Sequence, residues 1–187
     1  LMWADQALSK LLEHDFDTVI DIGSGTGEHA KYLRDKGKQV TTVSLEPPAD
    51  KIGDFMGMVL DPVEAIWASH VLEHQRNPGK FLERCFSLLT PNGILAVTVP
   101  PAKHNIVGGH VNLYNAGILL YQMILAGFDC SQASVKSYGY NISVVVKKKK
   151  ANLPPLRMDS GDINRLAEFF PMEVREGFDG QIGEINW

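Results

Sequence analysis

The stretch that decides the fold is Val19-Ile20-Asp21-Ile22-Gly23-Ser24-Gly25-Thr26-Gly27-Glu28. Its first half is apolar except for one acid, which is typical of a buried parallel strand. The three glycines at alternate positions predict a tight turn whose backbone passes close to a ligand. A helix is predicted to follow from Glu28 to about Lys36, with Gly37 at its end. This order of strand, glycine turn and helix is the first unit of a nucleotide-type site at the carboxyl end of a parallel strand.

The spacing of the glycines distinguishes between ligands. The dinucleotide fingerprint G-x-G-x-x-G would need glycine at position 28, where this chain has Glu28. A carboxylate in the first helical turn disfavours a pyrophosphate and favours a cationic ligand. A nicotinamide dehydrogenase is therefore the weaker alternative, and a glycine turn with a purely structural purpose is another.

The rest of the chain alternates strands and helices, which predicts an α/β fold. Val- and Thr-rich or apolar runs predict strands at residues 39–45, 65–69, 94–99, 133–138 and 141–147, and a short one near 51–53. Helical periodicity predicts helices at about residues 3–12, 78–89 and 116–126, and a last one after Ser160, which is placed to cap it. A turn is predicted at residues 90–93. The tail to Trp187 carries aromatic residues and is expected to fold back on the body.

Composition limits the class of protein. The 187 residues suit one domain, and the net charge of −4 argues against a nucleic-acid binder that relies on a broad basic surface. No apolar run approaches the ~20 residues of a membrane span, and no signal peptide is visible. Cys85 and Cys130 are far apart in sequence, so we predict reduced cysteines in a cytoplasmic protein.

Several motifs together resemble the class I methyltransferases that use S-adenosylmethionine (SAM), of the small-molecule type represented by the methyltransferase type 11 and 12 families. The pattern Asp21-x-Gly23-x-Gly25-x-Gly27 is similar to their cofactor loop. Further similar segments are residues 68–74 after strand four, 88–95 around a proline turn, 109–114, and Ala126-Gly127-Phe128. The resemblance spans about residues 15–147 and does not cover the tail.

The resemblance implies a doubly wound, mostly parallel sheet of seven strands, with helices on both faces and one antiparallel strand. It implies a SAM-dependent methyltransferase domain over residues 1–150, and we expect residues 151–187 to pack on the same domain as a C-terminal extension. The cofactor would lie at the carboxyl edge of strands one, two and four and would leave as S-adenosylhomocysteine.

The resemblance also implies roles for individual residues of the glycine loop. Gly23 and Gly25 would approach the methionine part of the cofactor, and Asp21 would help to hold its amino end, directly or through water. The other residues of the loop carried over as cofactor-binding are Ser24, Gly27 and Glu28.

Further cofactor contacts are implied beyond the loop. The family has an acid at the end of strand two that binds both ribose hydroxyls; here Ser44 stands closest to that position and Glu46 is the nearest acid. Alternation along a strand would place these two residues on the same face. Asp54 and Phe55 are similar to the adenine contact, with Asp61 as a rival acid. Residues expected to pass under the cofactor at the end of strand four are Ala68, Ser69 and His70.

Methyl transfer is an in-line displacement, so the protein must chiefly align the acceptor with the activated methyl group. A general base is needed when the acceptor is protonated, as a hydroxyl would be, and histidine is the natural candidate near neutral pH. We predict His70 and His110 as the catalytic residues. The alternative is that these histidines only hold loops by hydrogen bonds.

The leading hypothesis is methylation of an oxygen or nitrogen atom of a small molecule, such as a saccharide or another biosynthetic intermediate. A SAM-binding sensor or scaffold without turnover is the alternative. We expect no metal site, because a catechol-type site would need clustered carboxylates and an amide where this chain offers His and Glu. Nucleic acid is excluded as a substrate on the ground that Pro100-Pro101 follows strand five, whereas nucleic-acid amino methyltransferases carry two prolines after strand four. No membrane partner is expected, and the oligomeric state, monomer or homodimer, stays open.

Overall fold

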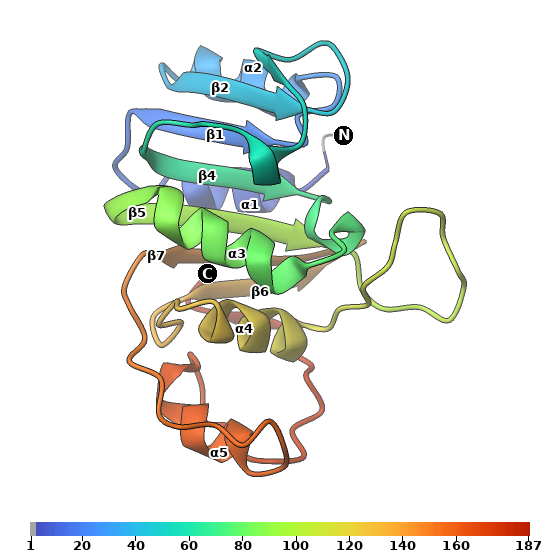
Figure 1. The fold of residues 1–187 in the computed structure, drawn as a ribbon, viewed down its shortest axis with the longest axis vertical. Helices are drawn as coiled ribbons and strands as arrows, with labels where there is room; N and C mark the ends of the chain where they lie inside the picture. The colour runs from blue at the N-terminus through green and yellow to red at the C-terminus, as the bar shows by residue number, and fades with distance from the viewer. Residues whose placement is uncertain (1–2) are drawn as a thin grey trace.

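The computed structural model describes residues 3–187, and its centre is one sheet of eight strands (Figure 1). The spatial order is β3-β2-β1-β4-β5-β7-β6-β8. β7 runs antiparallel to its neighbours β5 and β6, and β8 runs antiparallel to β6. The strands are β1 (Thr18–Ile22), β2 (Gln39–Ser44), β3 (Lys51–Ile52), β4 (Val63–Ser69), β5 (Leu89–Val99), β6 (Ser134–Tyr138), β7 (Asn141–Lys147) and β8 (Glu184–Ile185). The predicted doubly wound α/β fold is confirmed, with an eighth strand that the tail adds.

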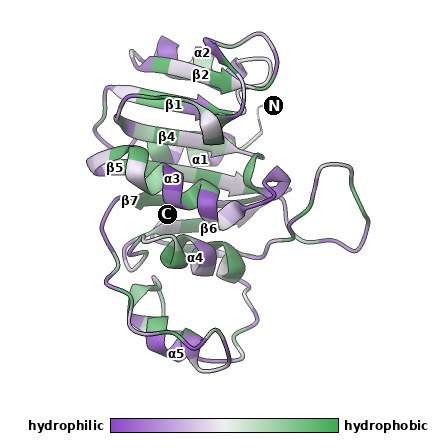
Figure 2. Cartoon of the chain, viewed as in Figure 1, coloured by the Kyte–Doolittle hydropathy of each residue, from purple (hydrophilic) through white to green (hydrophobic). Residues whose placement is uncertain are grey.

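Helices cover both faces of the sheet because successive side chains of the buried strands point to opposite sides. In β4, Ile66 joins the core under α3 and α4, whereas Trp67 joins the core under α1 and α2. Apolar residues accordingly run along the central strands and through α4 (Figure 2). The helices are α1 (Asp5–Leu11), α2 (Glu28–Asp35), α3 (Pro78–Leu88), α4 (Ala116–Leu125) and α5 (Asp162–Leu166). In the described part of the chain, none of them has the length and apolar character needed to cross a bilayer.

Two local predictions need correction. The predicted turn at residues 90–93 lies inside β5 as an irregularity, because Val63 of β4 already pairs with Leu89 before Ala65 pairs with Ile94. Asn92 adopts φ +61° there, a left-handed conformation that asparagine tolerates well. Ser160 does not cap α5; the cap position is Gly161, with φ +95°.

Residues of the tail pack against the sheet and α4. Leu166, Phe169, Phe170 and Ile182 are buried in the same core as the strands under α3 and α4. The tail backbone also pairs with β6 through β8. The division of the chain at residue 150 stays a prediction.

The contact between the tail and α4 depends on a glycine. The Gly117 N–H donates to the Gly180 carbonyl oxygen at 2.9 Å. A Cβ atom at Gly117 would lie 2.6 Å from the Phe178 ring and 2.7 Å from the Gly180 Cα. Both distances are below van der Waals contact, so only glycine permits this approach.

One acid is buried within the sheet. Asp21 of β1 is 1 % exposed, and its Oδ2 atom has no hydrogen-bond partner within residues 3–187. Burial raises the pKa of Asp21 from 3.8 to about 7, against the opposing charge of Arg34 and the backbone N–H of Ala30. Desolvation of the charged form outweighs the partners that would stabilise it.

The raised pKa predicts a pH-dependent stability difference between the wild type and Asp21→Asn. Between about pH 4 and pH 7 the folded carboxyl keeps a proton that the unfolded chain has lost. The wild type should therefore lose about 1.4 kcal/mol of unfolding free energy per pH unit relative to the variant, and nothing further above about pH 7. Urea unfolding of both proteins from pH 5 to pH 8 checks this, and a pH-independent difference would refute it.

The tight contact at Gly117 predicts that Gly117→Ala pushes the tail away from α4. We expect a loss of about 1–3 kcal/mol in unfolding free energy, as for other overpacked positions. Limited proteolysis should then cut within residues 171–187 faster than in the wild type. The matched control is Gly79→Ala in α3, where an added Cβ meets no atom within 4 Å; equal protection of the tail in the two variants would contradict the prediction.

Candidate functional site

Two cavities meet over the glycine loop at the carboxyl edge of β1 and β4. Cavity A, of about 830 Å³, lies between the loop, the end of β2 and the segment before α3. Cavity B, of about 360 Å³, lies between the loop and the segment after β4. The two cavities share Gly23, Gly25, His70 and His74. Strand order reverses between β1 and β4, and such a switch point leaves a crevice at the carboxyl ends of the strands.

The backbone of the glycine loop is held in a conformation that favours glycine. Gly23, Gly25 and Gly27 have φ values of +73°, +51° and +82°. The Gly23 and Ser24 N–H groups both donate to the Val43 carbonyl oxygen, at 2.8 and 3.2 Å, which ties the loop to β2. At Gly25 an added Cβ would meet no atom within 4 Å, so this backbone faces open cavity. The loop thus presents bare backbone to a ligand.

Cavity A has an acid and an aromatic side chain on one wall. Asp54 is exposed there, and its Oδ1 atom accepts a hydrogen bond from the Met56 N–H at 2.9 Å. Phe55 is buried against Phe81, with ring centroids 5.2 Å apart. Ser44 lines the same cavity at the end of β2. A polar edge beside an apolar surface suits a planar heterocycle with a sugar.

His70 stands at the junction of the cavities with both ring nitrogens occupied. Its Nε2 atom lies 2.9 Å from Asn141 Oδ1, and its Nδ1 atom lies 3.4 Å from Glu73 Oε1. Burial by itself would lower the pKa of His70, but the contacts with Glu73 and Asn141 outweigh it and hold the pKa above the ordinary value of 6.5. The residue also has φ +55°, a conformation in which few non-glycine residues are found. These contacts favour a positioning role for His70.

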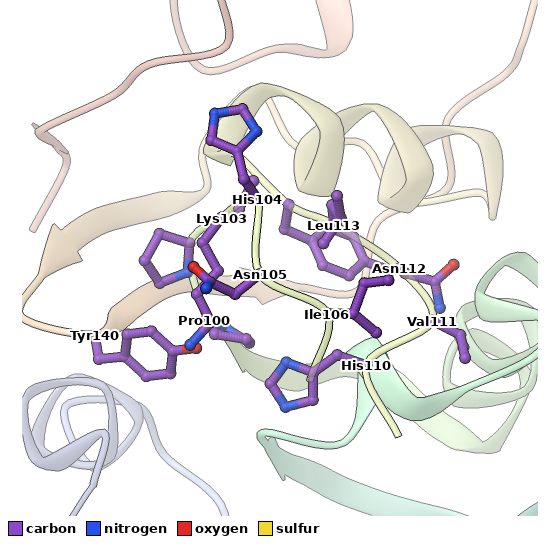
Figure 3. A pocket seen from close by; sticks show the side chains of 13 residues that line it. Pro100, Lys103, His104, Asn105, Ile106, His110, Val111, Asn112, Leu113 and Tyr140 are labelled. Carbon is purple, nitrogen blue, oxygen red and sulfur yellow. The ribbon is translucent and has the colours of Figure 1, made fainter. Parts of the chain in front are cut away.

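A loop between β5 and α4 forms a third cavity beside cavity B. This loop projects from the sheet at residues 100–115 (Figure 1). Cavity C, of about 250 Å³, lies under it and shares His110 and Tyr140 with cavity B. Figure 3 shows the rings of these two residues on the same side of cavity C, with the ring of His104 on the opposite side. The Lys103 Nζ atom lies 4.9 Å from the centre of the Tyr140 ring, which places a positive charge at the cavity.

The structure brings most of the predicted site residues together. The predicted residues on the wall of cavity A or B are Gly23, Ser24, Gly25, Glu28, Asp54, Phe55, Ser69, His70 and His110. Four others are not on these walls: Asp21 and Ala68 are buried beneath them, and Gly27 and Glu46 lie outside them. The alternation argument for Glu46 fails because β2 ends at Ser44, so no strand geometry orients position 46.

Sequence reasoning did not assign several wall residues of cavity B to the site. Glu73 and His74 follow β4 in a short 3₁₀ helix, and Tyr140 comes from the turn between β6 and β7. Glu73 and His74 lie within the family-like segment at residues 68–74, so the sequence did indicate that these two residues are near the site. From the sequence, Tyr140 could line an acceptor pocket or belong to the core, and the core was the preferred interpretation; its actual position depends on the pairing of β6 with β7.

The chain is similar in sequence to a curated methyltransferase. The chain is 26% identical over 159 residues to the tRNA 5-carboxymethoxyuridine methyltransferase of Escherichia coli K12, and the match covers 73% of this chain and 52% of that protein. The chain thus spans about half the length of the curated relatives it matches.

Solved structures share the fold. The Burkholderia thailandensis 1,6-didemethyltoxoflavin-N1-methyltransferase, solved with S-adenosylhomocysteine, superposes with a TM-score of 0.65 at 16% identity over 78% of each chain. A putative methyltransferase in complex with the Trm112 activator from Haloferax volcanii superposes with a TM-score of 0.57 at 17% identity, over 90% of this chain and 82% of that one.

The prediction that excluded nucleic acid is wrong, because the curated relative is a tRNA methyltransferase. The motif argument concerned only the methylation of amino groups, whereas the nucleoside named for the relative carries a carboxymethoxy group. The charge argument concerned a broad basic surface, and net charge does not report on a local contact.

The family assignment rests on a match to most of the chain. Residues 4–133 match the family described as a methyltransferase domain. This match includes β1 to β5, the glycine loop and the loop at residues 100–115. The chain belongs to the methyltransferase domain family.

Proposed function

We propose that this protein transfers a methyl group from SAM to an oxygen or nitrogen nucleophile. The observation that carries the proposal is the bare backbone of the glycine loop, exposed between two cavities beside acidic side chains. SAM has two parts that would extend from such a loop, a nucleoside and an amino acid joined by a sulfonium. Its positive charges suit a site with acids rather than a phosphate site.

The residues present fit this cofactor. The adenosine part would lie in cavity A, where Phe55 offers an apolar surface and Asp54 an acceptor for an amino group or a hydroxyl. The methionine part would lie in cavity B beside Gly25 and Glu28. The Ser24 Oγ atom is buried without a hydrogen-bond partner in the described chain, and a bound ligand would supply one. When bound, SAM supplies a methyl group activated by the sulfonium.

The chain's own contribution is alignment and, for a hydroxyl acceptor, removal of a proton. Cavity C adjoins cavity B at His110 and Tyr140, so an acceptor there would lie next to the methionine part of the cofactor. The His110 ring makes no side-chain hydrogen bond within residues 3–187, unlike His70, so it is free to take a proton. We therefore assign the base role to His110 and a positioning role to His70.

Two classes of acceptor fit cavity C, whose volume suits a group of about one sugar or one base. The first is a small molecule such as a saccharide, with Lys103 near an acidic substituent. The second is a single nucleotide of a tRNA, which the name of the curated relative favours.

The cofactor proposal predicts that Gly25→Arg abolishes SAM binding while the fold survives. The new side chain would enter open cavity rather than the core, and it would add positive charge where the cofactor's own positive charge lies. We expect a loss of at least about 100-fold in affinity, or about 2.7 kcal/mol, measured by calorimetry with SAM and S-adenosylhomocysteine. The matched control is Gly37→Arg, which has φ +82° and open space but lies at the far end of α2. Wild-type protein that binds neither compound would refute the proposed function.

The base assignment predicts that His110→Ala lowers kcat for a hydroxyl acceptor by about 10²-fold or more, while the affinity for SAM stays within twofold. Radiolabelled SAM, offered with a panel of hydroxyl, amine and carboxyl compounds and with total tRNA, identifies the acceptor for this measurement. Unchanged kcat in the variant would contradict the role of His110. Labelled tRNA would select the second acceptor class, and SAM binding without any labelled product would favour the sensor or scaffold over an enzyme.

A further inference from the structure

Three side chains at the junction of cavities B and C form a cluster of the kind that holds metal ions. Glu73, His74 and His110 each place one ligand atom within 4.8 Å of the others. Glu73 and His74 belong to the 3₁₀ helix Leu72–His74 after β4, and His110 lies on the loop between β5 and α4. The loop folds over the end of β4, where the Asn112 side-chain amide donates to the carbonyl oxygen of Glu73, 39 positions earlier in the chain, at 3.4 Å.

The Glu73 carboxylate is the first observation that points to a cation in this cluster. The residue is fully buried, and neither oxygen makes a hydrogen bond of good geometry in the part of the chain that the structure describes, although the His70 Nδ1 atom lies 3.4 Å from Oε1. The loop holds it in place, since the Val111 and Asn112 N–H groups both donate to the Glu73 carbonyl oxygen, at 2.9 and 3.2 Å. A buried carboxylate without partners is costly, so a cation beside it would be strongly stabilised.

The orientation of His74 is the second, independent sign. Its Nδ1 atom lies 2.8 Å from the Gly109 carbonyl oxygen, so Nδ1 carries the hydrogen and donates it. In the neutral ring the lone pair of Nε2 then faces Glu73 Oε1 at 3.7 Å, so that two acceptors oppose each other. Metal-binding histidines are oriented by such a hydrogen bond from the other nitrogen. Gly109 makes the bond possible, because a Cβ there would lie 2.6 Å from His74 Nδ1.

The His70 ring also contacts the Glu73 carboxylate, but it lies near only one of the two oxygens. Its Nδ1 atom is 3.4 Å from Glu73 Oε1, and its other nitrogen faces Asn141. That contact leaves Oε2 without a partner in the described residues, and it does not remove the opposition between Glu73 and the lone pair of His74. A cation between Glu73, His74 and His110 would resolve both.

We propose that Glu73, His74 and His110 bind a divalent transition-metal ion, with Zn²⁺ as the best match. Two imidazoles and one carboxylate are a known ligand set for zinc that keeps a position open for another ligand. The expectation of no metal considered only oxygen ligands, whereas histidine nitrogen suits Zn²⁺ and its neighbours. Given the proposed function, the ion would lie where cavity B meets cavity C at His110 and would polarise an oxygen of the acceptor; with His110 as its ligand, this polarisation would take the place of the general base assigned above.

Metal titration without SAM tests the site directly. Tag-free protein, stripped with a chelator and dialysed, is titrated with Co²⁺ while its visible absorption is recorded, and Zn²⁺ is then added to displace it. We expect one equivalent of Co²⁺ to bind and Zn²⁺ to displace it. Glu73→Gln and His110→Ala should each weaken binding at least about tenfold. The matched control is His104→Ala on the same loop, which should bind as the wild type does.

The titration has clear contrary outcomes. Absence of saturable Co²⁺ or Zn²⁺ binding would overturn the proposal, and so would equal affinity in the wild type and His110→Ala. Thermal unfolding checks that the variants are folded. Should Glu73→Gln fail to fold, His110→Ala still tests the proposal, because His110 lies on an exposed loop. Calorimetry with SAM is independent: SAM binding without metal binding overturns only this inference, and metal binding without SAM binding overturns only the proposed function.

Discussion

The constraint on which the site depends is the reversal of strand order between β1 and β4. β2 and β3 lie on one side of β1, and β5 lies on the far side of β4, so the connections after these two strands leave in opposite directions. Their divergence opens the crevice at the carboxyl edge. The glycine loop after β1 and the 3₁₀ helix after β4 form its two walls, and Gly23 is packed against Val71 where they meet. The methionine part of the cofactor would lie between these walls, whereas Asp54 and Phe55, which follow β3, would hold its adenosine part.

The loop at residues 100–115 is the second determinant of the site, because it carries His110 to the end of β4. Its backbone is anchored on both sides: the Ala102 N–H donates to the Tyr114 carbonyl oxygen at 2.7 Å, and Val111 and Asn112 donate to the Glu73 carbonyl oxygen. The loop thus both covers cavity C and contacts Glu73 on the wall of cavity B, so a ligand of Glu73 would affect the two cavities together.

The sequence predicted the framework well because the framework depends on local patterns. The apolar run before Gly23 and the helical spacing of Phe81, Leu82 and Cys85 are readable from neighbouring residues, and the structure confirms the strand and the helix. Strand β8 was missed, because a two-residue strand has no period and depends on pairing with β6. The misplaced turn at residues 90–93 has the same cause: its residues are typical of a turn, yet pairing with β4 begins before it.

The sequence by itself determined the class of fold, the ligand-facing glycine loop and the family resemblance, because each rests on residues that are close along the chain. Only the tertiary structure decided which polar groups share the site. It placed Glu46 outside the cavity walls, occupied both nitrogens of His70, and brought Glu73 and His74 against His110. These outcomes depend on distances between segments that are far apart in sequence, and on burial, which sets the energetic cost of each unpaired charge.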